Sequence, residues 1–231
     1  MVELMVALAA GSVVLMTTIQ TLNHFQQRLE DQQELIGLHQ DQRIGMRILE
    51  EELRMASSGT GWDHGLIRAD QQEIEFNANV GGYQTNLVQP VSRHEEELHV
   101  RDGGGWRKGK RLVVCTADHC AEGRLEKEGR SASLILTHPL AESFPTGSEV
   151  AISNHIRYYV SRNRLGTLNL MREVDGGSNT IIADLNTLSF TYFDKQGKST
   201  SNPEAITCVR VSLAVGKDRH AIVSEIGLRT R

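Results

Sequence analysis

The sequence predicts an α+β fold in which a long N-terminal helix, membrane-spanning in its first half, packs on a β-rich antiparallel C-terminal head. Residues 2–56 contain no proline and are rich in helix-forming residue types, whereas after Gly61 short alternating segments are separated by turn residues. No charged residue occurs from Leu4 to Asn23, which is about the length needed to cross a hydrocarbon core. We therefore expect a helix over 1–56, with a membrane segment over 1–23, and a head over 57–231.

Composition limits the function classes. A chain of 231 residues is long enough for an extended element and one head domain. Its 25 basic and 29 acidic residues give a net charge of −4, which provides no strong attraction to nucleic acid or to anionic lipid. A cleaved signal peptide is disfavoured because no Lys or Arg precedes the apolar run and a helical pattern continues directly out of it.

The outer part of the predicted helix is amphipathic, and its apolar residues recur at spacings of three, four and seven. We interpret them as one stripe on a helix about 80 Å long that connects the membrane segment to the head. Glycines at 11, 37 and 45 each weaken a helix by about 1 kcal/mol, which makes them candidates for bending or close packing. The sequence Ser57-Ser58-Gly59 supplies a stop signal. The residues of the stripe are Leu22, Phe25, Leu29, Ile36, Met46, Leu49, Leu53 and Ala56.

Twelve segments of the head alternate between apolar and polar residues, as half-buried strands do. Glycine-containing turn sequences separate many of them, among them Asp175-Gly176-Gly177. The predicted strands are Leu66–Arg68, Glu73–Asn77, Glu97–Arg101, Arg111–Cys115, Ser133–Thr137, Glu149–Ser153, Ile156–Arg162, Thr167–Glu173, Thr180–Ala183, Thr187–Asp194, Ile206–Val215 and His220–Arg229.

The three cysteines are too few for a disulfide scaffold. A disulfide between Cys115 and Cys120 is favoured for an exported head, because the two residues flank a short loop between strand-like segments. Free thiols, and a zinc site that would include His119, remain alternatives. Cys208 lies in an apolar run and is interpreted as a buried thiol.

The first eleven residues, MVELMVALAAG, resemble the mature N-terminus of type IV pilins and type II secretion pseudopilins, and most closely that of PilW-type minor pilins. In these families a lone glutamate precedes an uncharged membrane helix. Weaker similarity continues in LEEELRMASSG, IRYYV, LNLMREVDGG, IIADLNTLSFTYFDKQG and ITCVRVSLAV. The resemblance implies a long helix whose second half packs on an antiparallel sheet.

The same resemblance implies a structural minor pilin, not an enzyme and without a cofactor, that helps to initiate, cap or stabilise a type IV pilus. A J-like pseudopilin at the tip of a secretion pseudopilus, or a pilus-associated adhesin or DNA-binding minor pilin, are the alternatives. The processes that the resemblance implies include cell adhesion, twitching motility and secretion. The implied location is the inner membrane, with a single span and a periplasmic head, and then an extracellular pilus or periplasmic pseudopilus. Subunit contacts are assigned by the resemblance to Glu3, Leu4, Val6, Leu8 and Gly11.

The implied partners are other major and minor pilins, an inner-membrane assembly platform and, if a leader exists upstream, a prepilin peptidase. Family members carry a basic leader and two further residues before the segment that matches Met1, so we expect the reading frame to begin upstream. An ionised carboxylate at membrane depth is costly and tends to mark a partner. For Glu3 the resemblance implies the N-terminal amine of a neighbouring subunit; an interfacial position that favours the helix dipole is the alternative.

Two further motifs suggest chemistry. The sequence HEEELH from His94 to His99 differs from the zinc motif HExxH by one residue in spacing, and we interpret its histidines as surface residues. A basic cluster beside an aromatic residue is a candidate for contact with a nucleic-acid backbone, although a solvated hairpin turn is favoured. This cluster consists of Trp106, Arg107, Lys108, Lys110 and Arg111.

Overall fold

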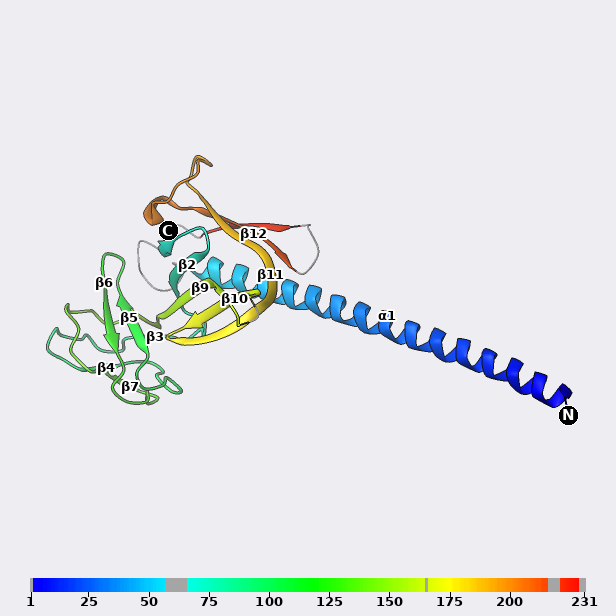
Figure 1. Ribbon diagram of the computed structural model, residues 1–231. Helices are drawn as coiled ribbons and strands as arrows, with labels where there is room; N and C mark the ends of the chain where they lie inside the picture. Colours follow the sequence, from blue (N-terminus) through cyan, green and yellow to red (C-terminus); the bar gives the residue numbers. More distant parts are fainter. Residues whose placement is uncertain (1, 57–65, 165, 216–220, 229–231) are drawn as a thin grey trace.

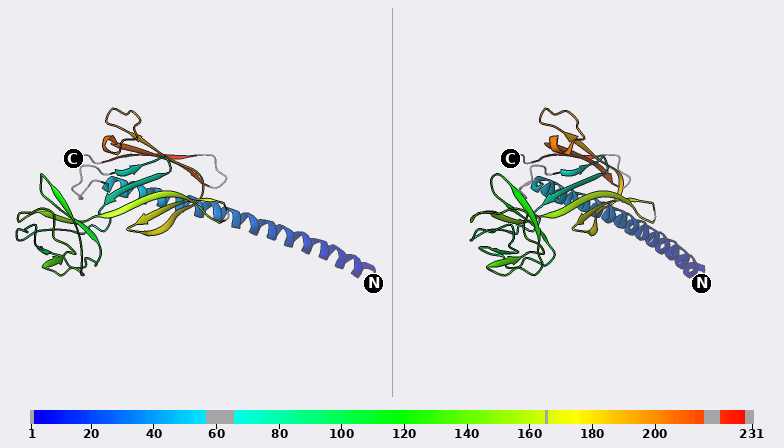
Figure 2. Two further views of the ribbon diagram at one scale, coloured as in Figure 1. Left: turned by 60° about the vertical axis from the view of Figure 1, so that its left-hand side comes forward. Right: turned by 90° about the vertical axis from the view of Figure 1, so that its left-hand side faces the viewer.

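The computed structural model describes residues 2–56, 66–164, 166–215 and 221–228; for residues 2–10, 12–14, 30–31, 34–35 and 38 it describes the backbone alone. A helix, α1 (Val2–Met55), is 54 residues long. Its C-terminal end lies within a β-rich head, and its N-terminal part projects away from the head as an isolated rod (Figure 1). The views in Figure 2 show the same separation from two other directions.

The largest sheet of the head contains seven strands in the order β1-β2-β9-β10-β11-β12-β13, and all neighbours are antiparallel. A two-residue turn joins β10 to β11, and both of its residues, Asp175 and Gly176, have positive φ values of 51° and 91°. This is the Asp-Gly hairpin turn for which the sequence carries a signal. The strands are β1 (Leu66–Ala69), β2 (Glu73–Ala78), β9 (Asn154–Arg162), β10 (Leu168–Val174), β11 (Gly177–Phe193), β12 (Cys208–Val215) and β13 (Ile222–Gly227).

Strand β11 curls the sheet around the end of α1 (Figure 1). Its first half pairs with β10 and its second half with β12, and both registers shift close to Asp184, whose φ is 52°. The sequence predicted two strands here, Thr180–Ala183 and Thr187–Asp194, and that prediction is wrong. The turn-like conformation of Asp184 bends one continuous strand, as a β-bulge does, instead of ending it.

A second β unit is inserted between β2 and β9, which are neighbours in the seven-stranded sheet. It forms a four-stranded and a two-stranded sheet around its own apolar core, which includes Leu98, Leu112 and Phe144. The sequence did not predict two of its strands, whose sequences are QTN and CAEGR, because neither alternates between apolar and polar residues. The strands are β3 (Gln84–Asn86), β4 (Glu97–His99), β5 (Arg111–Cys115), β6 (Cys120–Arg124), β7 (Ser133–Ile135) and β8 (Glu149–Ile152), and a 3-10 turn, η1 (Pro203–Ala205), precedes β12.

The last turns of α1 supply its contacts with the sheet. Leu49, Leu53 and Ala56 are fully buried in the same core as Phe76 of β2 and Val211 of β12. The helix approaches β11 closely at one glycine, because a Cβ at Gly45 would lie 2.4 Å from Cγ1 of Ile182. Gly45 therefore permits close packing, which is one of the two roles that the sequence suggested for it.

The predicted α+β fold class is wrong in two respects: the share of helix relative to strand, and the membrane-spanning segment. Strands in three sheets make up most elements of the described chain, so the molecule is mainly β, with a curled antiparallel sheet. Within the described residues, no helix is both long enough and apolar enough for a membrane crossing. An uncharged run is not necessarily apolar: polar residues at 17, 18, 20 and 21 interrupt this one. This finding overturns the predicted transmembrane segment and the single-pass inner-membrane location.

A buried polar cluster joins α1 to the sheet. The Glu52 carboxylate, with a side chain 6% exposed, accepts hydrogen bonds from the Arg172 guanidinium, with Nε at 2.9 Å from Oε2. The hydroxyl of Tyr158 donates to the same carboxylate at 2.5 Å. Burial, followed by the charge of Glu52, raises the pKa of Tyr158, so this hydroxyl remains a donor.

We predict that Arg172→Leu lowers the free energy of unfolding by about 2 kcal/mol, because it leaves a buried carboxylate without its cation. Urea denaturation of the full chain measures the change. The matched control is Arg210→Leu, which removes a solvent-exposed ion pair with Glu225 and should cost less than about 1 kcal/mol. If the two variants lose the same free energy of unfolding, the buried pair stabilises the fold no more than the exposed pair does, and the prediction is wrong.

Candidate assembly surface and polar sites

The projecting part of α1 presents large apolar side chains to solvent. Phe25 is 61% exposed and Leu22 is 56% exposed, although both are residue types that normally avoid water. Four of these residues recur at intervals of seven, from Leu15 to Ile36, which is the repeat of helices that pack side by side. We call this set the outer stripe. It consists of Leu15, Ile19, Leu22, Phe25, Leu29, Ile36 and Ile44.

The outer stripe and the residues that pack on the head lie on opposite sides of α1. At about 100° per residue, the stripe occupies an arc of about 120°. Gln42, Met46, Leu49 and Leu53, which are buried in the head, lie on an arc centred about 150° away. Ile44 continues the stripe beside the head and is still 59% exposed. The helix therefore packs one face on its own sheet and leaves the apolar stripe exposed within the described residues.

This geometry corrects the prediction of a single apolar stripe from Leu22 to Ala56. The spacing is helical in both halves, but the two halves face in opposite directions. The side chains of Glu3, Leu4, Val6 and Leu8, which the resemblance assigned to subunit contacts, lie outside the described part of the structure. Gly11 is described and exposed, and nothing lies within 4 Å of a Cβ built on it.

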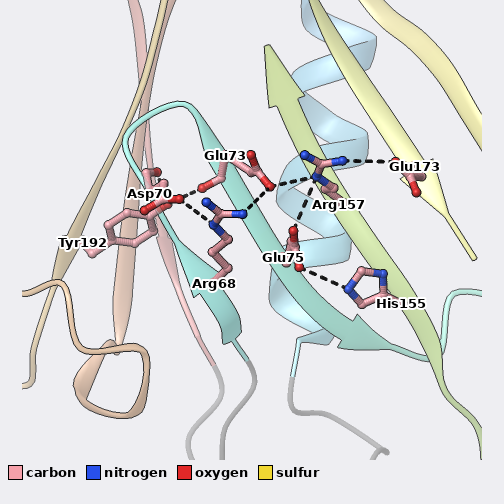
Figure 3. Close-up of polar contacts among 8 residues, drawn as sticks. All are labelled: Arg68, Asp70, Glu73, Glu75, His155, Arg157, Glu173 and Tyr192. Atoms are coloured by element: carbon pink, nitrogen blue, oxygen red, sulfur yellow. Dashed lines mark hydrogen bonds and ion pairs between the residues drawn. The ribbon is translucent and has the colours of Figure 1, made fainter. Parts of the chain in front are cut away.

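A charged cluster covers the outer face of β2, β9 and β10, on the side of the sheet away from α1 (Figure 3). Arg157 lies at its centre, 2.8 Å from Glu73, 3.4 Å from Glu75 and 3.6 Å from Glu173, each measured between nitrogen and carboxylate oxygen. Its guanidinium also lies 4.4 Å from the centre of the Tyr159 ring. Three strands are thus joined across their solvent face by one cation.

The ends of this cluster are also paired. Arg68 contacts Asp70 at 2.6 Å and Glu73 at 3.3 Å, while His155 lies 3.4 Å from Glu75. The hydrogen bond from Arg157 lowers the pKa of Glu73 below its usual value, even though partial burial acts in the opposite direction. Since the carboxylates already have cationic partners, the cluster is suited to holding strands together. No group of His, Cys, Asp and Glu in the described ranges is arranged to hold a metal ion.

The two nearby cysteines form a disulfide between Cys115 at the end of β5 and Cys120 at the start of β6. The sequence favoured this pairing over free thiols and zinc. The bond closes the β5–β6 hairpin, in which these residues are directly paired. Cys208 is an unpaired cysteine of intermediate exposure in β12, and burial raises the pKa of its thiol.

The basic cluster from Trp106 to Arg111 does not form an open nucleic-acid platform. Trp106 is 3% exposed and belongs to the core of the inserted unit, so its ring is not available for stacking on a base. Lys110 is engaged by Asp175 at 2.7 Å, and Arg111 begins β5. Arg107 and Lys108 are exposed in the turn before that strand. The geometry therefore supports the turn interpretation.

The histidines of HEEELH are exposed and do not share a helix face. His94 lies in the segment before β4, and His99 is the last residue of that strand. Leu98 between them is fully buried. Burial alternates only within β4, and the exposure of both histidines fits their interpretation as surface residues.

The comparisons with known proteins give no family assignment. No family model matches the chain, and no curated protein matches it.

Sequence reasoning missed the residues that connect distant elements. Glu52 is one of three consecutive acids, Glu50 to Glu52, and only its position three residues after Leu49 indicated that it faces the sheet. Its partner Arg172 is 120 residues away, and no local signal links the two. The cluster around Arg157 was missed for the same reason, although alternation in β2 correctly places Glu73 and Glu75 on one face.

We predict that Glu73→Gln removes a pH-dependent part of the stability. Because the folded-state pKa of Glu73 is lowered, its contribution is fully present above the unfolded value of 4.5 and is lost as the pH falls through the folded value. The difference in free energy of unfolding between wild type and variant should therefore shrink below about pH 4.5. Urea denaturation at several pH values between about 3 and 6 measures it.

The control for this series is Glu51→Gln, which removes the exposed pair with Arg47 on α1. That pair contributes less than about 0.5 kcal/mol. A wild-type advantage over Glu73→Gln that stays constant across the pH range would contradict the assigned role of Glu73.

Proposed function

We propose that this chain is a structural subunit of a pilin-like filament and that it assembles through the outer stripe of α1. The observation that carries the proposal is the direction of the stripe. Large apolar side chains recur with a heptad spacing on the face of α1 opposite the head, where no part of the described chain covers them. Contiguous exposed apolar surface of this kind marks an interaction site.

A second helix of the same kind is the partner that fits the stripe. Spacings of seven, with intermediate residues at three or four, keep a seam facing a neighbouring helix along its length. The rod extends away from the head, so equivalent rods from several subunits can pack in parallel while their heads remain outside. The resemblance of MVELMVALAAG to pilin N-termini agrees with this arrangement. No catalytic step is part of the proposal.

The head supports the same role because it resists displacement of the helix. The Glu52 pair with Arg172 and the close approach at Gly45 fix the last turns of α1 on the curled sheet. A force along the rod is therefore transmitted to a sheet whose strands are joined across their outer face by Arg157. A filament subunit requires this kind of connection between its assembling segment and its exposed domain.

We expect Leu22→Glu combined with Phe25→Glu to weaken self-association of the full chain at least tenfold, because it places two charges in the seam. Sedimentation equilibrium measures the association, and negative-stain electron microscopy shows whether filaments form. The matched control is Gln20→Glu combined with Gln27→Glu, which adds the same charge on the opposite side of the helix and should leave association unchanged.

Two outcomes would contradict the proposal. The first is a wild-type chain that remains monomeric at about 100 μM, a concentration that detects even weak association. The second is an equal effect of the two double variants, which would mean that charge, and not the position of the stripe, controls association.

A further inference from the structure

A cleft lies where the inserted β unit meets the seven-stranded sheet. Its volume is about 230 Å³. The connection from β2 to β3 supplies Val80 and Tyr83, the turn before β5 supplies Trp106, and the ends of β8 and β10 supply Ile152 and Val174. The walls are therefore apolar and come from both units of the head, a location where ligand sites are common.

The aromatic wall of the cleft is held in place. The Tyr83 ring lies edge-on to Trp106, with ring centroids 6.2 Å apart. The side chain of Asn79 fixes the backbone of Tyr83 at both polar atoms: its amide donates to the carbonyl at 3.0 Å and its oxygen accepts from the N–H at 3.2 Å. Tyr83 nevertheless remains 42% exposed. The Tyr83 ring is therefore both fixed in position and accessible, so an apolar group can pack against it.

The polar groups of the cleft carry an excess positive charge. Lys110 lies 2.7 Å from Asp175, and the buried Asn154 donates to the same carboxylate at 2.9 Å. Burial alone would raise the pKa of Asp175, but the hydrogen bonds from Lys110, Asn154 and the His155 backbone lower it, so Asp175 stays ionised and neutralises Lys110. Arg107 also lines the cleft and forms no ion pair within the described ranges. One uncompensated cation therefore stands beside an apolar pocket.

We infer that this cleft binds a small aromatic or branched aliphatic carboxylate, with the apolar group against Tyr83, Val80 and Val174 and the carboxylate on Arg107. The volume exceeds the roughly 150 Å³ of a cavity that holds benzene, so a single ring with a short acidic arm fits. The same chemistry occurs in a free acid and in the C-terminal residue of a polypeptide. The site is separate from the outer stripe of α1, and its test does not depend on filament assembly.

The test is a titration of the full chain with 3-phenylpropanoate. Trp62→Phe leaves Trp106 as the single tryptophan, so its fluorescence reports on the cleft. We expect saturable binding with a Kd of about 1 mM, which is typical of a ligand of this size. The uncharged 3-phenylpropanamide should bind about fivefold more weakly, because it cannot use the charge of Arg107.

The matched variants are Arg107→Gln and Lys108→Gln. Both remove one exposed positive charge from adjacent positions, but only Arg107 lines the cleft. We expect the first to weaken binding of the acid about fivefold and the second to leave it unchanged. Equal effects of the two variants, equal affinity for the acid and its amide, or the absence of saturation up to about 10 mM would each overturn the inference.

A peptide arm distinguishes the two sources of the ligand. A tetrapeptide with a free C-terminal phenylalanine is compared with the same peptide amidated at its C-terminus. If the free peptide binds more tightly than 3-phenylpropanoate, the ligand is a polypeptide terminus. If only the small acid binds, the ligand is a free carboxylate of metabolite size. Both results support the site.

Discussion

Glu52 is an acid buried at the end of α1, and its carboxylate is held by Arg172 of β10 and by the hydroxyl of Tyr158 from β9. A buried carboxylate without such partners would oppose folding, so the helix can settle on the sheet only where both donors meet it. The cluster thereby sets the rotation of the helix about its own axis. The direction in which the exposed side chains of α1 point follows from that rotation.

The most direct consequence is the orientation of the outer stripe. Glu52, Leu49 and Leu53 face the sheet. The side chains of the outer stripe, on the same helix, therefore point away from it. A rotation of half a turn would turn Ile44 toward the head and would turn the stripe of the projecting rod to the other side of the helix axis. The contacts of Glu52 with Arg172 and Tyr158 therefore do two things. They stabilise the packing of the helix on the head, and they orient the surface that we assign to assembly.

The inserted unit adds a second surface without disturbing the first. It enters and leaves the head through β2 and β9, which remain paired with each other, and it carries its own core and disulfide. The salt bridge between Lys110 and Asp175 ties it to the β10–β11 turn. That tie also forms one side of the cleft, so the contact that fixes the unit on the sheet shapes the proposed carboxylate site.

The sequence by itself determined the features that depend on near neighbours. Alternation located strands such as Glu73–Ala78 and Arg111–Cys115 to within a residue or two, and the short separation of Cys115 and Cys120 identified the disulfide. Only the tertiary structure decided the opposite orientation of the two halves of the stripe, the burial of Trp106 and the pairing of Glu52 with Arg172. Helical spacing gives the angles between side chains, but not which arc is removed from water. That choice depends on contacts between residues more than 100 positions apart, whose energies no local pattern contains.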